Sequence, residues 1–337
     1  MTSGDASLDG WLPIRLYWRE NTPWIDWCHV GDRPLAEPFF DHSIEQCLRL
    51  PFNRAFRRQT PIEVMTEQAR LRPGLPPDGF VFHTSRCGST LMAQLLTALD
   101  DCLVVSEASV VRALLSPQVR ERGVSESQQV AWLRALLGVL GAPRRGERRY
   151  FVKWEPWHSV DLPLLQHAFP DARWIFMYRD PLEVMVSLDR ECGGWLVPGA
   201  IDPAMLRLDA VAPWQLARED YHARVLARIC DAALGCGDHP RALFVDYDEL
   251  PGAAWGRVAR HFGIACSAVE LQRLRERAQR DAKAPRQVFR SDRAEKAALA
   301  NESLREATER WLVPRFRALA KLRERQDAWA ATAGDCP

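Results

Sequence analysis

The stretch that decides the fold reads Gly79-Phe80-Val81-Phe82-His83-Thr84-Ser85-Arg86-Cys87-Gly88-Ser89-Thr90-Leu91. Its first half is an apolar run bounded by turn residues, which predicts a strand. Its last residue opens a series of leucines at helical spacing, which predicts a helix: Leu91, Leu95, Leu96 and Leu99. A turn between a strand and a helix presents backbone N–H groups at the positive end of the helix dipole. The segment therefore predicts an anion site.

This turn differs from the phosphate loop of ATPases and kinases. That loop ends in Gly-Lys-Ser/Thr, and aligning Ser89-Thr90 with its end places Gly88 where the lysine would stand. Arg86 supplies positive charge instead. The loop is poorly suited to the β- and γ-phosphates of ATP, and it suits a donor that places one phosphate there. A simple strand-to-helix turn would carry the same glycine, so the rest of the chain has to decide.

Further apolar runs alternate with helical patterns along the chain. The strand candidates are residues 102–105, 150–152, 174–178 and 242–245. This alternation predicts an α/β fold of the P-loop type, with three layers, a central parallel sheet flanked by helices and ligands at the carboxyl ends of the strands. Residues 202–235 and 301–325 also have helical patterns.

Residues 1–77 form a tryptophan-rich N-terminal extension, which closes with the turn-rich run Arg72-Pro73-Gly74-Leu75-Pro76-Pro77. The main domain then covers residues 78–330. Two roles are open for the aromatic residues of the extension: they line a site for an acceptor, or they form a small packed layer.

Composition narrows the class of protein. The chain has 337 residues, of which 47% are hydrophobic and 26% charged, with a net charge of +1. This net charge indicates neither a basic protein that binds nucleic acid nor a strongly acidic one. No stretch approaches the roughly 18 uncharged apolar residues that span a membrane. The N-terminus lacks a leader pattern, and nine cysteines suit reduced thiols. We expect a cytoplasmic protein with no nucleic-acid or membrane partner; its oligomeric state is not indicated.

Lysine is rare in this chain. Of 45 basic residues only four are lysines, at positions 153, 283, 296 and 321. Coding bias explains the scarcity, but each position that keeps a compact, titratable ammonium group is worth attention.

A second motif begins at residue 174. A hydrophobic strand delivers Arg179 to its carboxyl end, Asp180 can cap a helix and Pro181 suits the first helical position. Ser187 falls about two turns into that helix, where its hydroxyl and the guanidinium of Arg179 can converge on a phosphate.

Together the two motifs resemble the 5′-phosphate loop and the 3′-phosphate motif of sulfotransferases that use 3′-phosphoadenosine 5′-phosphosulfate (PAPS). In that family a basic residue stands two positions before the loop glycine, as Arg86 does before Gly88, and an Arg and a Ser stand eight residues apart, as Arg179 and Ser187 do. The run at 243–250 is similar to the family's strand that ends in Tyr-Glu-Asp-Leu. The resemblance covers residues 79–265.

The motif spacing is closest to the tyrosylprotein branch. Glu107 lies 21 residues after Arg86, and Lys153 lies 26 residues before Arg179, as that branch places its catalytic residues. Bacterial small-molecule and carbohydrate sulfotransferases share this plan, so a protein-tyrosine acceptor is not inferred.

The resemblance implies a role for each matching residue. The loop (Arg86, Cys87, Gly88, Ser89 and Thr90) would hold the 5′-phosphate, and Arg179 and Ser187 would hold the 3′-phosphate. Lys153 would act at the bridging oxygen, with Arg86 as a further catalytic cation, and Glu107 would be the base, with Glu155 as its competitor. The product would be 3′-phosphoadenosine 5′-phosphate (PAP), and no metal is expected.

The acceptor is expected to be a small molecule with a hydroxyl or amine group. The run Arg286-Gln287-Val288-Phe289-Arg290-Ser291 either covers the donor, as a basic segment of the family does, or caps a helix. Two alternative functions stay open. One is a kinase for a small molecule, and the other is a non-catalytic nucleotide-binding protein, which would need neither Glu107 nor Lys153.

Overall fold

A five-stranded parallel sheet lies at the centre of the protein, in the order β5-β6-β4-β7-β8. The computed structural model describes residues 7–200, 203–206, 208, 213–284, 287 and 299–333. The strands lie within one residue of the predicted bounds and are β4 (Gly79–His83), β5 (Cys102–Ser106), β6 (Arg149–Lys153), β7 (Arg173–Tyr178) and β8 (Ala242–Asp246). The predicted α/β class and its central parallel sheet are confirmed.

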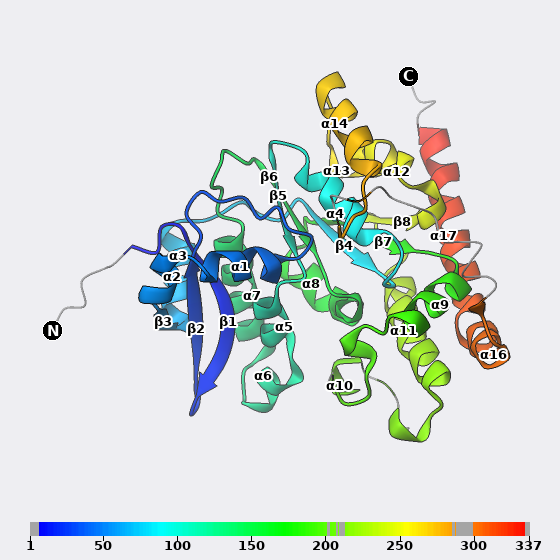
Figure 1. Cartoon of the computed structure of the whole chain (residues 1–337), viewed down its shortest axis with the longest axis horizontal. Coiled ribbons are helices and arrows are strands. Elements are labelled where there is room, and N and C mark those ends of the chain that lie inside the picture. Colours follow the sequence, from blue (N-terminus) through cyan, green and yellow to red (C-terminus); the bar gives the residue numbers. More distant parts are fainter. Residues whose placement is uncertain are drawn as a thin grey trace.

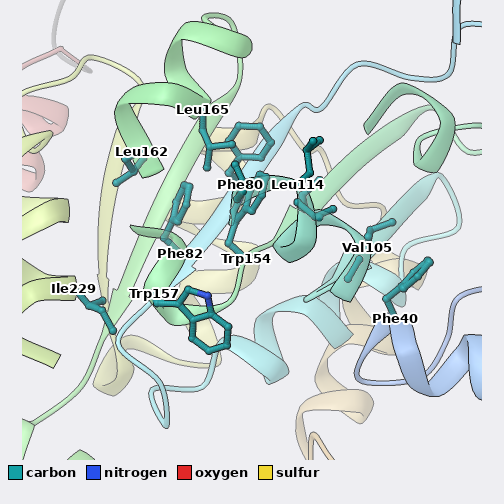
Figure 2. Packing of buried hydrophobic residues seen from close by; sticks show 14 of the residues in the cluster. Phe40, Phe80, Phe82, Val105, Leu114, Trp154, Trp157, Leu162, Leu165 and Ile229 are labelled. Atoms are coloured by element: carbon teal, nitrogen blue, oxygen red, sulfur yellow. The ribbon is translucent and has the colours of Figure 1, made fainter. Parts of the chain in front are cut away.

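Both faces of the sheet are buried. Successive side chains of each strand point to opposite sides, and each side packs into its own hydrophobic cluster. Phe80 and Phe82 of β4 belong to the larger hydrophobic cluster, and Val81 between them belongs to the smaller one. Figure 2 shows Phe80, Phe82 and Trp154 together on the larger side. The rings of Phe82 and Trp154 stack there with centroids 5.9 Å apart. The sheet is therefore the middle layer of three, as predicted.

Helices cover each face (Figure 1). The smaller cluster is covered by α4 (Ser89–Thr97), α12 (Gly252–Trp255), α13 (Arg257–Phe262) and α14 (Ala268–Ala278). The larger cluster receives side chains from α5 (Ser109–Leu115), α6 (Pro117–Glu121), α7 (Glu126–Leu140), α8 (Leu162–Ala168), α9 (Pro181–Arg190), α11 (Arg218–Gly235), α16 (Glu302–Trp311) and α17 (Val313–Ala333).

The N-terminal segment forms a separate antiparallel sheet at one end of the molecule (Figure 1). It consists of β1 (Trp11–Arg19), β2 (Thr22–His29), α1 (Phe40–Leu48), α2 (Pro51–Ala55), β3 (Arg58–Pro61) and α3 (Ile62–Leu71). Its apolar residues join the larger hydrophobic cluster, with Trp27 buried and Trp11 and Trp18 packed against it. Trp11, Trp18 and Trp27 thus form a packed layer, and none of these three lines the main cavity.

Two predicted helical regions are interrupted. Within residues 202–235 the described parts are the short helix α10 (Pro203–Leu206), a 3₁₀ turn (Pro213–Gln215) and α11. The segment 301–325 divides at Leu312 into α16 and α17, because Pro314 lacks an N–H and fits only the first turn of a new helix. The run 286–291 lies outside the described residues, except for Gln287. No helix in the described part of the chain is long and apolar enough to cross a membrane.

Candidate active site

A cavity of about 570 Å³ opens at the carboxyl ends of four neighbouring strands, β5, β6, β4 and β7. Eight of the residues singled out from the two motifs and the family spacing line it: Arg86, Gly88, Ser89, Thr90, Glu107, Lys153, Arg179 and Ser187. Glu155, the alternative base, lines it as well. Segments far apart in sequence therefore meet at the edge of the sheet where ligands of α/β proteins bind.

The loop between β4 and α4 has an unusual backbone. Ser85 and Arg86 both adopt left-handed conformations, with φ of 73° and 51°, and Gly88 follows at 81°. A Cβ atom on Gly88 would lie 2.6 Å from Leu250 and 3.0 Å from the ring of Tyr247. Glycine is therefore required both by the positive φ and by the lack of space for a side chain. The N-cap residue of α4 is Gly88, which has no side chain to accept hydrogen bonds from the first N–H groups of the helix. These N–H groups therefore need another acceptor. The loop has the properties of an anion cradle.

Cys87 differs from its neighbours in the loop. Its side chain is fully buried, its thiol donates to the carbonyl oxygen of Met177 at 3.2 Å, and burial raises its pKa to about 11. It does not line the cavity, so any contact with a bound anion is limited to its backbone N–H. Burial and the raised pKa of this thiol favour a packing role.

Lys153 and Glu107 form a buried ion pair at the centre of the site. Lys153 ends β6 and is only 1% exposed, and Glu107 follows the neighbouring strand β5. The two strands fix the pair, because Ser106 lies beside Lys153 in the sheet and the N–H of Glu107 donates to the carbonyl of Lys153 at 2.8 Å. Glu107 itself has a left-handed φ of 51°, which turns the chain at this point.

The charge of Glu107 is strongly stabilised. Burial would raise its pKa, but the Lys153 ammonium and the nearby His83 ring outweigh burial and hold the pKa at about 2. As long as Lys153 stays in contact with it, Glu107 is a carboxylate but a weak base.

Glu155 belongs to a different charge network. Its carboxylate lies 3.2 Å from His158 and 3.5 Å from Arg112, and His158 also lies 3.0 Å from Asp161. Burial would lower the pKa of His158, but the two carboxylates raise it to about 9 and keep the ring positively charged. The negative charge of Glu155 is therefore balanced by His158 and Arg112 rather than by Lys153.

The two arginines of the predicted phosphate sites also contact carboxylates in this structure. Arg86 donates to the carboxylate of Glu191 at 2.6 Å and to its carbonyl oxygen at 2.8 Å. Arg179 pairs with Glu183 and lies over the ring of Tyr247, 3.9 Å from its centroid. The positive charges of Arg86 and Arg179 are thus each neutralised by a carboxylate of the protein itself.

Several residues that line the cavity were not predicted. They include His83, Phe39, Arg112, Trp157, Glu191, Trp195 and Lys283. The pKa of Lys283 is lowered by burial and by the positive charge of Arg86. The rarity of lysine was a signal for this residue, but nothing in the local pattern marked the others.

A comparison with protein families decides the class of enzyme. A model described as the sulfotransferase family matches residues 79–268, which include both phosphate motifs, Glu107 and Lys153. The chain belongs to the sulfotransferase family. The predicted enzyme class, which transfers a sulfuryl group, is confirmed. The likeness to the tyrosylprotein branch is finer than this match and stays a prediction.

This sulfotransferase is also similar to solved structures. A Mycobacterium avium sulfotransferase is 19% identical with a TM-score of 0.44, over 74% of this chain and 80% of that one. One from Alicyclobacillus acidocaldarius is 15% identical with a TM-score of 0.42, over 74% and 96%. A mouse sulfotransferase in complex with PAP is 11% identical with a TM-score of 0.42, over 79% and 94%. No curated protein sequence is significantly similar to the chain.

The contact between Arg86 and Glu191 predicts a competition with anionic ligands. The Glu191 side chain is 78% exposed and is easily displaced. Because exposed ion pairs contribute about 0.2–1 kcal/mol, Glu191→Gln should tighten the binding of PAP about 1.4- to 5-fold in calorimetry at low salt. Glu67→Gln, which removes the exposed partner of Arg70 elsewhere, is the matched control and should leave the affinity unchanged. Weaker binding in Glu191→Gln would contradict this interpretation.

Proposed function

We propose that this sulfotransferase moves a sulfuryl group from PAPS to a hydroxyl or amine group of a small acceptor. The observation that carries the proposal is the Lys153–Glu107 pair, which lies in the same cavity as the anion cradle and Arg179. A cation and a carboxylate beside an anion cradle are what group transfer from a phosphosulfate needs.

The donor spans the cavity in this proposal. Its 5′-phosphate accepts hydrogen bonds from the backbone N–H groups at the start of α4 and from Arg86. The phosphate thereby replaces the Glu191 carboxylate as the partner of Arg86. Its 3′-phosphate lies between Arg179 and Ser187, two residues of the same wall that line the cavity together. Because Arg179 also lies over the Tyr247 ring, its guanidinium is held in place before the donor arrives.

The transfer step uses three side chains. The acceptor oxygen or nitrogen attacks the sulfur in line with the bridging oxygen, and its proton passes to Glu107. The bond between sulfur and the bridging oxygen breaks, and its electron pair stays on the 5′-phosphate of PAP. Lys153 and Arg86 stabilise the negative charge that develops on that oxygen.

In this proposal the ion pair also links the basicity of Glu107 to the binding of the donor. In the free protein, Lys153 keeps the pKa of Glu107 at about 2. When the donor attracts the Lys153 ammonium towards the bridging oxygen, Glu107 loses its strongest stabilising charge and its proton affinity rises. The base is therefore activated by binding of the donor.

The acceptor side of the cavity is aromatic. Phe39, Trp157 and Trp195 line it, and the rings of the two tryptophans lie 5.3 Å apart. A cavity of about 570 Å³ is in the usual range for small-molecule ligands. We propose that residues 1–77 act as an extension whose contribution to the site is Phe39, and that residues 78–330 form the catalytic domain.

We also propose a cytoplasmic location, supported by the cysteines. The described cysteines are all free thiols, and Cys28, Cys47, Cys87, Cys102 and Cys230 are buried as thiols. Reduced, buried thiols are typical of a reducing compartment. The net charge of +1 supports a small-molecule partner rather than nucleic acid.

The donor can be tested without knowing the acceptor. We expect purified protein to bind PAP in a calorimeter, and to bind ATP with Mg²⁺ at least about 10-fold more weakly, because no lysine follows the loop glycine to hold the γ-phosphate. Tight binding of ATP with no binding of PAP would point to a kinase instead.

The transfer roles predict a clear split between binding and turnover. With ³⁵S-labelled PAPS and an extract of small metabolites as the acceptor pool, Glu107→Gln and Lys153→Met should each lower the transfer of label at least about 100-fold, because each removes a group that acts in the transition state. Both should still bind PAP within a few-fold of wild type.

Glu155→Gln is the control for the base, because Glu155 lines the same cavity. It should keep most of the transfer activity. If Glu155→Gln is inactive and Glu107→Gln is active, the base is Glu155.

A further inference from the structure

His83 connects three parts of the site, namely the anion cradle, the end of β6 and Glu107. It is the last residue of β4, directly before the anion cradle, and it is 4% exposed. Its Nδ1 atom accepts the N–H of Ser85 at 3.0 Å. Its Nε2 atom lies 3.1 Å from the carbonyl oxygen of Trp154 and 3.4 Å from Oε1 of Glu107.

These contacts fix the proton on the ring. A backbone N–H can only donate, so Nδ1 must be the unprotonated nitrogen. The proton of the neutral ring is therefore on Nε2, which donates to the Trp154 carbonyl and faces the Glu107 carboxylate. Two acceptors on one side and one donor on the other leave no freedom for the ring to flip.

The ring is also kept neutral. Burial, and then the positive charge of Lys153, lower the pKa of His83 to about 4, although Glu107 acts in the opposite direction. Among the described residues, the charged groups that act on the ring are Lys153 from β6 and Glu107 from the turn after β5. A neutral ring does not compete with Lys153 for Glu107 as a second cation would.

Each contact of His83 constrains a different functional element. Ser85 has a left-handed φ of 73°, a conformation that non-glycine residues keep only when their surroundings impose it. Trp154 follows Lys153 directly, and Glu107 is the proposed base. One ring thus links the backbone of the cradle, the strand end that carries Lys153 and the carboxylate.

We propose that His83 is a positioning residue for sulfuryl transfer: its Nδ1 holds the anion cradle in shape, and its Nε2–H orients Glu107. The inference rests on the proposed function for the meaning of these two elements. His83 does not touch the donor or the acceptor in this role, and it transfers no proton.

Two substitutions separate the two halves of the ring. The Oδ1 atom of an asparagine stands the same number of bonds from Cβ as Nδ1 of histidine, and the Nε2 atom of a glutamine stands as far as Nε2. His83→Asn therefore keeps an acceptor for Ser85 and loses the donor towards Glu107. His83→Gln keeps the donor and loses the acceptor.

The two variants should show opposite losses. His83→Gln should bind PAP about 10-fold more weakly in calorimetry and leave the titration of Glu107 unchanged. His83→Asn should bind PAP within about 2-fold of wild type, while its Glu107 carboxyl group binds its proton about 10-fold more tightly. In ¹³C NMR of labelled glutamate from pH 7 to pH 3.5, assigned with Glu107→Gln, the wild type and His83→Gln should show no onset of Glu107 protonation, whereas His83→Asn should show the onset at the lowest pH values.

Equal behaviour of the two variants would overturn the proposal, whether both match wild type or both lose PAP affinity and melting temperature together. The latter result would mean that His83 only fills space. If one variant does not fold, the other still has its own predicted readout. A wild-type protein that does not bind PAP would contradict the proposed donor instead, and the titration of Glu107 would still test the contact with His83.

Discussion

The site depends on one interaction, the ion pair between Lys153 and Glu107. An ammonium group that is 1% exposed at the end of a central strand costs several kcal/mol to desolvate unless an opposite charge accompanies it. The parallel pairing of β5 with β6 places Glu107 where that charge is needed. The same pairing brings both groups to the edge of the sheet where the anion cradle opens, so the interaction that makes Lys153 tolerable also places it for catalysis.

The site balances positive charge with its own carboxylates in the same way at three places. Lys153 is held by Glu107, Arg86 by Glu191 and Arg179 by Glu183. A strongly anionic donor can replace a carboxylate at each of these cations. The exposed Glu191 gives way most easily, and the loss of Lys153 from Glu107 has a chemical consequence, because it turns a weak base into a stronger one. Binding of the donor and activation of the base are thus two results of one exchange of partners.

The sequence was sufficient for the sheet and for the residues at its strand ends. Apolar runs gave the strands to within one residue, and Lys153, Glu107 and Arg179 lie at strand ends because the chain turns where those runs stop. The sequence was insufficient for the part of the cavity wall that loops contribute. Phe39 and Glu191 reach the cavity from loops, and no periodicity encodes how a loop folds back. Residues 203–206 and 213–215 likewise form only short helical turns, in a region whose pattern had predicted helix.

In a chain with few lysines, the lysine at position 153 has a physical reason. Its compact ammonium group contacts Glu107 and can move from there to a donor oxygen. The most direct test of this account is the pKa of Glu107 in the free protein and in its complex with PAP, measured by ¹³C NMR of labelled glutamate and assigned with Glu107→Gln. The account predicts a carboxylate that stays ionised down to about pH 3 when free, consistent with a pKa of about 2, and a clearly higher pKa with PAP bound. An unchanged or lower pKa in the complex would contradict it.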